Sequence, residues 1–272
     1  MSKRHFISLT LPLLLALTAC SGPQAPAPDA TPAPPATAAT PETAPAETAS
    51  PAEATPPAEQ AAAEPAAEAA QAPAPAAPRG PAPVAGVDYV EIANGQPFQP
   101  AAGRIEVAEV FGYTCPACAQ FEPVFQSWKK RQPADVSAIQ VPAAFGGYWL
   151  PYARAFYAAE ALGVLPQSHD AMFNAIHVQR SLPVNNNVTA EQIAPFYAQY
   201  GVDAKRFADT YNSFGVDAKM NRARQFAVKT RVEGTPSLVV NGKYTVSVDQ
   251  QGYEKMLNTV DWLVAQERGG AN

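Results

Sequence analysis

The sequence predicts one folded domain of the α/β class, over about residues 85–272. It is preceded by a long tract that lacks the large apolar side chains of a hydrophobic core. A predicted strand over 105–111 leads directly into a predicted helix whose apolar residues recur at helical spacing. Residues 21–83, in contrast, hold 17 of the 29 prolines and contain no Val, Ile, Leu, Phe, Tyr or Trp. Because such a segment cannot offset the entropy lost on ordering, we expect it to be disordered.

The first residues have the composition of a secretory signal. Lys3, Arg4 and His5 form a basic start, and residues 6–17 are almost wholly apolar. As a helix this apolar stretch would rise only about 18 Å, which is too short to span a bilayer. The pattern is that of an export signal rather than a membrane anchor.

The end of this signal resembles the lipobox of bacterial lipoproteins, which is carried here by Leu17-Thr18-Ala19-Cys20. The resemblance implies a signal peptide over 1–19, cleavage before Cys20 and a diacylglycerol on the Cys20 sulfur. Ser21 favours sorting to the outer membrane. The alternative is ordinary cleavage to a soluble periplasmic protein.

We interpret residues 20–84 as a disordered linker rich in Pro, Ala and Glu. Proline-rich tracts favour the polyproline II conformation, and this one reaches on the order of 200 Å at full extension. The linker would then be a spacer between a membrane anchor and a folded domain over 85–272. The alternative is a passive low-complexity tail.

The charge pattern argues against a nucleic-acid partner. The formal net charge is −5, and no long basic block occurs. The short run Lys129-Lys130-Arg131 falls where the predicted helix ends, and cations at that position favour the helix dipole.

The chain has three cysteines, of which Cys20 belongs to the signal region. The other two form Cys115-Pro116-Ala117-Cys118. A structural zinc site needs four ligands, and His169 and His177 are the remaining candidates, so we expect no metal. A purely structural disulfide usually closes a longer loop. A redox-active pair is the third interpretation, and it requires a helix that begins at the first cysteine.

The local pattern supports that helix. Gly112-Tyr-Thr interrupts the predicted strand, and the expected buried face of the helix then follows at Phe121, Val124, Phe125 and Trp128. Pro116 suits the first turn of a helix. Cys115 would thus lie at the N-terminus, where free N–H groups and the dipole stabilise a thiolate and lower the thiol pKa. Cys118, one turn further, would be the buried resolving thiol.

Several motifs occur in the order typical of one family. They are Glu109-Val-Phe-Gly-Tyr-Thr-Cys115-Pro-Ala-Cys118, Gln120-Phe-Glu122, Gly146-Gly147, Ala161-Leu-Gly163, Gly234-Thr-Pro236 and Val240-Asn-Gly-Lys-Tyr244. On these residues the chain resembles the DsbA family of periplasmic dithiol oxidases. The resemblance implies a thioredoxin-like fold with a helical insertion over about 152–215. It also implies strands near 136–142, 237–241 and 244–248, a helix near 216–230 and a C-terminal helix.

The resemblance also implies the activity. The Cys115–Cys118 disulfide would be transferred by thiol–disulfide exchange to unfolded or folding exported proteins that carry free thiols. No other cofactor would be needed. A DsbB-like inner-membrane protein would reoxidise the pair, and the protein would act as a monomer. Pro236 matches the family's cis-proline, and the backbone of Thr235 would pair with an extended substrate segment.

At three positions the residue, or its expected partner, differs from that of the well-known members of the family. Ala117 replaces the histidine of well-known members and cannot stabilise a thiolate, so we predict a weaker oxidant. Thr235 is similar to the residue of disulfide isomerases, which keeps an envelope isomerase or reductase open as an alternative. Glu109 matches a buried acid of the family, and the alternative is a strand residue that faces solvent. Its usual lysine partner is replaced by the stretch 137–140. A non-catalytic peptide-binding module is the remaining alternative.

Overall fold

The computed structural model describes residues 78–99 and 103–270. The predicted signal peptide, Cys20 and nearly all of the predicted linker lie outside these residues, so those expectations stay predictions. Within the described ranges, none of the helices combines the length and the apolar character needed to cross a membrane.

A five-stranded sheet with the order β1-β5-β4-β2-β3 forms the centre of the domain. Its strands are β1 (Val90–Glu91), β2 (Ile105–Phe111), β3 (Val136–Pro142), β4 (Ser237–Val240) and β5 (Tyr244–Ser247). Strand β2 pairs in parallel with β3 and antiparallel with β4, and all seven of its residues are buried. The strands expected near 105–111, 136–142, 237–241 and 244–248 are therefore confirmed.

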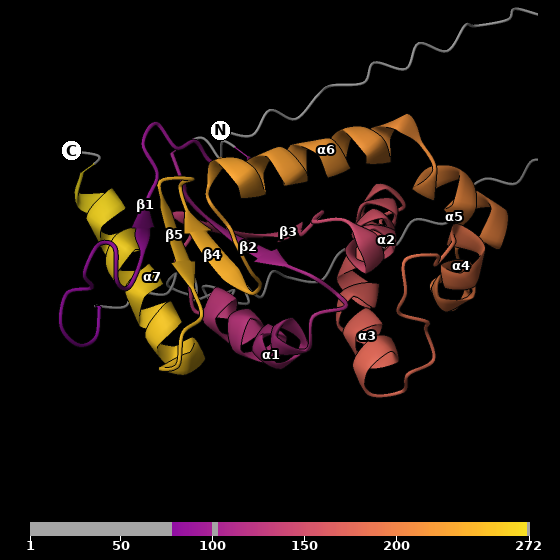
Figure 1. The fold of residues 1–272 in the computed structure, drawn as a ribbon, viewed down its shortest axis with the longest axis horizontal. Coiled ribbons are helices and arrows are strands. Elements are labelled where there is room, and N and C mark those ends of the chain that lie inside the picture. Colours follow the sequence, from indigo (N-terminus) through magenta and orange to yellow (C-terminus); the bar gives the residue numbers. More distant parts are fainter. Residues whose placement is uncertain (1–77, 100–102, 271–272) are drawn as a thin grey trace, which may run out of the picture. The chain divides into compact units, whose positions relative to one another are not determined.

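Three helices cover the sheet: α1 (Pro116–Lys130), α6 (Phe214–Lys229) and α7 (Gly252–Gly269). Side chains alternate along β2. Val107 packs in one cluster with residues of α1 and α7, whereas Ala108 and Val110 pack in another with residues of α6. Figure 1 shows α6 running along one side of the sheet, with α1 and α7 on the other. Glu109 lies two residues after Val107 and therefore on the same face of the strand, so its side chain points toward α1.

The predicted helical insertion is present. A short 3₁₀ turn, η1 (Gly147–Trp149), leads into α2 (Leu150–Ala161), α3 (Leu165–His177), α4 (Ala190–Ala198) and α5 (Ala204–Tyr211). It begins at 150 rather than 152, with Pro151 in its first turn. Helix α6 also begins two residues earlier than expected, because the Ser213 side chain accepts the Val216 N–H and caps it.

Helix α1 begins and ends as predicted. Pro116 lies in its first turn, Cys115 is its N-cap, and two lysines lie in its last turn. The expectation that Val124 belongs to the buried face is wrong, since its side chain is 37% exposed. The buried stripe instead passes through Glu122, which lies four residues after Cys118.

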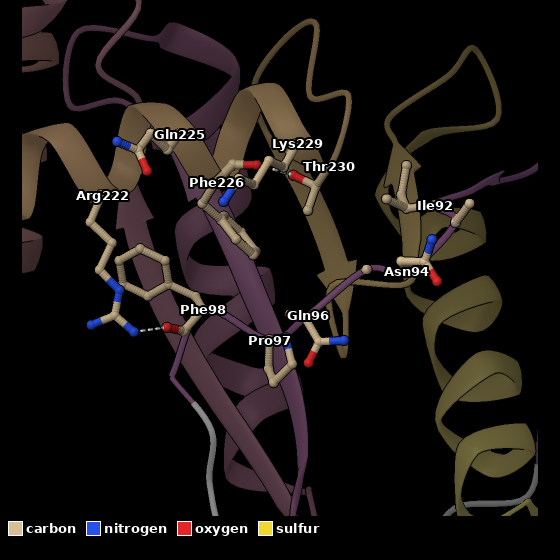
Figure 2. A pocket seen from close by; sticks show the side chains of 12 residues that line it. Ile92, Asn94, Gln96, Pro97, Phe98, Arg222, Gln225, Phe226, Lys229 and Thr230 are labelled. Atoms are coloured by element: carbon tan, nitrogen blue, oxygen red, sulfur yellow. Dashed lines mark hydrogen bonds between the residues drawn. The ribbon is translucent and has the colours of Figure 1, made fainter.

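A cavity of about 400 Å³ lies between residues 92–98 and α6 (Figure 2). Arg222 closes one wall, because its guanidinium lies 4.6 Å from the centre of the Phe98 ring and donates to the Phe98 carbonyl. Neither cysteine of the Cys115–Cys118 pair lines this cavity.

Gly242 explains part of the motif Val240-Asn-Gly-Lys-Tyr244. It lies in the β4–β5 turn with a φ of +68°, and a Cβ there would overlap the backbone of Gln96.

We predict that Gly242→Ala destabilises the protein by about 1–3 kcal/mol through overpacking and backbone strain. Thermal unfolding measures this loss. Gly215→Ala, in the open first turn of α6, is the matched control and should cost nothing; an equal melting temperature for Gly242→Ala and wild type would contradict the prediction.

Candidate active site

Cys115 and Cys118 lie where β2 gives way to α1. Residues 112–114 turn the chain, and the Cys115 N–H donates to the Gly112 carbonyl at 3.0 Å. Both thiols are free in this structure. Cys115 is 8% exposed and Cys118 is fully buried, so a second thiol can reach only the first of the two sulfurs.

The start of α1 stabilises a charge on Cys115. The Cys118 N–H donates to the Cys115 sulfur at 3.3 Å, in the position of a helix N-cap. A hydrogen bond from the Cys118 thiol, with smaller contributions from Thr235 and from the N–H groups of Cys118 and Ala117, lowers the pKa of Cys115 to about 6, against the opposing effect of burial. Burial, together with the neighbouring Cys115, raises the pKa of Cys118.

The loop between α6 and β4 completes the surroundings of Cys115. The Thr235–Pro236 peptide bond is cis, as the family resemblance implies. The Cys115 thiol donates to the Thr235 carbonyl at 3.5 Å, so this loop lies directly beside the accessible sulfur. Pro116 is exposed and Ala117 half-buried in the first turn of α1. Sequence reasoning missed Tyr253 of α7, whose hydroxyl donates to the Ala117 carbonyl at 2.8 Å.

Glu109 is fully buried, so of the two interpretations left open by the sequence the buried one is confirmed. As the sequence predicts, the stretch 137–140 supplies no lysine, and the partner there is a glutamine. Gln140 lies opposite Glu109 in the β2–β3 register and donates to its Oε2 at 2.8 Å. Among the described residues, its Oε1 has no hydrogen-bond partner. Burial and the nearby charge of Glu122 raise the pKa of Glu109 well above its usual range.

From the sequence, Glu122 was named only as part of the family motif Gln120-Phe-Glu122 and was given no role, although a charged residue on the buried stripe of α1 was a signal. Its carboxylate accepts N–H groups of Gln126 at 2.7 Å and of Gln140 at 2.9 Å. His169 Nε2 lies 3.3 Å from Glu122 Oε1, close enough for an ion pair but without the geometry of a good hydrogen bond. Burial opposes ionisation, yet His169 and the two amides leave the pKa of Glu122 below its usual range.

Both histidines of α3 contact Tyr113, two residues before Cys115. The Tyr113 hydroxyl and His169 Nδ1 are 2.6 Å apart, and His177 Nε2 lies 2.7 Å from the Tyr113 carbonyl, to which its N–H donates. His169 is buried and packs edge-on against Phe111 and Phe173. From the sequence, both histidines were considered as candidate zinc ligands, and these contacts were missed.

Among the described residues, one group of three side chains has the spacing of a metal site: Glu122, His169 and Asp170, with ligand atoms within 4.8 Å of one another. The group includes neither cysteine. Glu122 already accepts two amide N–H groups, and His169 is engaged by Tyr113. These contacts describe a hydrogen-bond network better than a metal centre.

Comparison with known proteins agrees with this geometry. A family model described as a DSBA-like thioredoxin domain matches residues 138–261. The thiol:disulfide interchange protein DsbA of Pseudomonas aeruginosa is 40% identical over 189 residues, which cover 69% of this chain and 87% of the relative. DsbA of Azotobacter vinelandii is 41% identical over 185 residues, or 67% of this chain and 84% of the relative.

Solved structures extend the similarity to the fold. The oxidoreductase DsbA of Xylella fastidiosa is 50% identical with a TM-score of 0.66, over 69% of this chain and 98% of that one. DsbA of Pseudomonas aeruginosa is 39% identical with a TM-score of 0.62, over 68% and 94% of the two chains. With its strand-to-helix cysteine pair, its inserted helices and these relatives, the chain belongs to the DsbA family of thioredoxin-like thiol–disulfide oxidoreductases.

Proposed function

We propose that the protein introduces disulfide bonds into exported proteins by exchange at Cys115 and Cys118. The observation that carries this proposal is the difference between the two thiols. Cys115 is accessible and has a lowered pKa, whereas Cys118 is buried and has a raised pKa. A thiol with a low pKa is a good leaving group, which favours transfer of the disulfide to a substrate.

The reaction begins with a Cys115–Cys118 disulfide. A substrate thiolate attacks the Cys115 sulfur, the disulfide breaks, and Cys118 leaves and takes up a proton because its thiol form is favoured. A second substrate thiolate then attacks the substrate sulfur of the mixed disulfide. Cys115 leaves as a thiolate, stabilised by the first N–H groups of α1. The substrate loses two electrons and the enzyme gains them.

The loop at Thr235 and Pro236 is the proposed substrate contact. The Thr235 carbonyl lies beside Cys115, so an extended substrate segment could add its backbone next to the cysteine that it attacks. Unfolded exported proteins offer such segments together with free thiols. Pairing through the backbone would make the enzyme tolerant of substrate sequence.

The relatives named DsbA support a periplasmic location and a DsbB-like inner-membrane protein that reoxidises the pair. We place the domain, as a monomer, on a membrane through lipidated Cys20, with Ser21 favouring the outer membrane. The linker would then let it reach its reoxidising partner.

A disulfide isomerase or reductase is the second candidate, and Thr235 before the cis-proline is the feature that favours it. Such an enzyme needs Cys115 and Cys118 kept reduced by another protein, whereas an oxidase needs them reoxidised. The redox state of the pair in cells distinguishes the two.

The pH dependence of alkylation tests the proposed roles of the two thiols. In the reduced full-length protein with Cys20→Ser, we predict that iodoacetamide modifies Cys115 at a rate that is half-maximal near pH 6, because only the thiolate reacts. The Cys115→Ser control should stay unreactive at neutral pH, since Cys118 is buried. A half-maximal rate near pH 9 for Cys115 would contradict its role.

The same shift predicts how the stability of the reduced protein varies with pH. Because the folded pKa of Cys115 is lowered from 9.0 to about 6, its thiolate stabilises the reduced fold fully above pH 9. This contribution disappears as the pH falls through 6. Thermal unfolding of the reduced and oxidised proteins should show their difference growing in favour of the reduced form from pH 6 to pH 9; a constant difference would contradict the shift.

Ala117 is predicted to limit the oxidising power. Ala117→His adds a donor in the first turn of α1 that favours the Cys115 thiolate and so stabilises the reduced form. We expect the potential to become more oxidising by on the order of 30–60 mV, measured by equilibration with glutathione. Ala119→His, on the side of α1 that lines the groove with α3, is the control. An unchanged or more reducing potential for Ala117→His would show the idea to be wrong.

Radiolabelled palmitate tests the proposed anchor. Cells that express the wild-type chain should incorporate the label into the protein, and it should fractionate with outer membranes. Cys20→Ser should lose both the label and the membrane fraction, because the acceptor sulfur is gone. Label retained by Cys20→Ser would exclude lipidation at this cysteine.

A further inference from the structure

A row of polar side chains joins the helical insertion to the strand that leads to Cys115. Tyr113 and His169 are 2.6 Å apart, and His169 lies 3.3 Å from Glu122. The amide nitrogen of Gln140 then donates both to Glu122 at 2.9 Å and to Glu109 at 2.8 Å. The thiol exchange described above uses none of these contacts, so the row has a role still to be assigned.

The two carboxyl groups of this row, those of Glu122 and Glu109, have different numbers of hydrogen-bond donors around them. Glu122 accepts N–H groups from Gln126 and Gln140 and lies beside the imidazole of His169. Within the described part of the chain, Glu109 accepts from Gln140 alone, and its second oxygen has no hydrogen-bond partner. Because donors favour the ionised form of a carboxyl group, a single negative charge belongs on Glu122.

One nitrogen bridges the two groups, so each carboxyl is exposed to the charge of the other. Both side chains are buried, where two like charges at such close range strongly disfavour each other. An amide nitrogen donates but does not accept, so Gln140 passes no proton between them. The pair is therefore coupled through charge, with one group ionised and the other protonated.

We propose that His169 is a positioning residue that holds the negative charge of this pair on Glu122 and thereby keeps Glu109 neutral. The proposal rests on the role of Cys115 as the exchanging thiol. Glu109 faces α1, whose N-cap is Cys115, so an anion on Glu109 and a thiolate on Cys115 repel each other. A neutral Glu109 leaves the thiolate favoured, so a histidine of the inserted helices acts on the reactive cysteine through two carboxyl groups.

Other charged groups face the pair from each neighbouring element. Lys129 of α1 acts on Glu109, and Asp170 of α3 approaches Glu122 and His169. Lys130 and His177 line the same groove of about 500 Å³ between α1 and α3 as Glu122 and Asp170. The two lysines and Asp170 are exposed, so solvent screens them. His169, which is 5% exposed, is the histidine in direct contact with Glu122.

The test is the pH profile of Cys115 alkylation in the reduced full-length chain with Cys20→Ser. We expect His169→Leu to move the profile to higher pH and to slow alkylation at pH 5, below the wild-type midpoint, by about threefold or more, which corresponds to a shift of about half a pKa unit. His169→Gln, which keeps an N–H for Glu122, should stay within about twofold of wild type. Glu160→Gln, an exposed carboxylate that pairs with Lys219, is the control and should have no effect.

A double variant tests whether His169 acts on Cys115 through Glu109. In a protein with Glu109→Gln, the change His169→Leu should no longer move the profile, because no carboxyl remains at 109 to take the charge. If His169→Leu folds poorly, His169→Asn keeps a polar side chain that is too short to reach Glu122. Carbon-13 NMR of labelled glutamate carboxyls reads Glu109 directly: it should stay protonated at neutral pH in the wild type and in His169→Gln, and ionise more readily in His169→Leu and His169→Asn.

The outcomes separate this inference from the proposed function. If wild-type Cys115 reacts near pH 6 and His169→Leu leaves its profile unchanged, the role of His169 is wrong and the oxidase proposal stands. If His169→Leu shifts the profile equally with Glu109 and with Gln at 109, His169 acts by another route and the inference is also overturned. If wild-type Cys115 is no more reactive than Cys118, the proposed function fails first.

Discussion

The contact between the Cys115 sulfur and the first N–H groups of α1 is the interaction on which the site depends. It exists because residues 112–114 turn the chain from the end of β2 into the helix, and because Pro116 can occupy a first turn in which no N–H is required. The same helix start that leaves part of Cys115 accessible buries Cys118 completely one turn later. A single local event, the start of a helix, therefore makes two chemically similar thiols behave differently.

The rest of the domain holds this helix start in place from several sides. Tyr253 of α7 binds the carbonyl of Ala117, and the loop at Thr235 lies against the sulfur. Two histidines of α3 bind Tyr113 at opposite ends of the residue. The thioredoxin-like core and the helical insertion thus both contact the short segment that carries Cys115. The proposed effect of His169 on Cys115, through Glu122 and Glu109, depends on this contact.

Local features of the fold and the site could be predicted from the sequence because they depend on neighbouring residues. The strand at 105–111, the cap at Cys115, Pro116 in the first turn and the basic end of α1 all follow from residues a few positions apart. Family motifs added the cis bond at Pro236 and the helical insertion. The resemblance placed Gln140 only within the stretch 137–140. His169 and Tyr253 could not be found in this way, since they contact residues 56 and 136 positions away in the chain. Spacing predicted the helix that contains Val124 but not how far its buried stripe extends around it.

The redox potential of the Cys115–Cys118 pair, measured by equilibrating the full-length protein with Cys20→Ser against glutathione, tests the central claim most directly. A leaving thiolate stabilised at the start of α1 predicts a pair more oxidising than glutathione, so that the disulfide passes readily to substrates. A potential well below that of glutathione would contradict this account and would assign the protein to the reductases or isomerases that another protein keeps reduced.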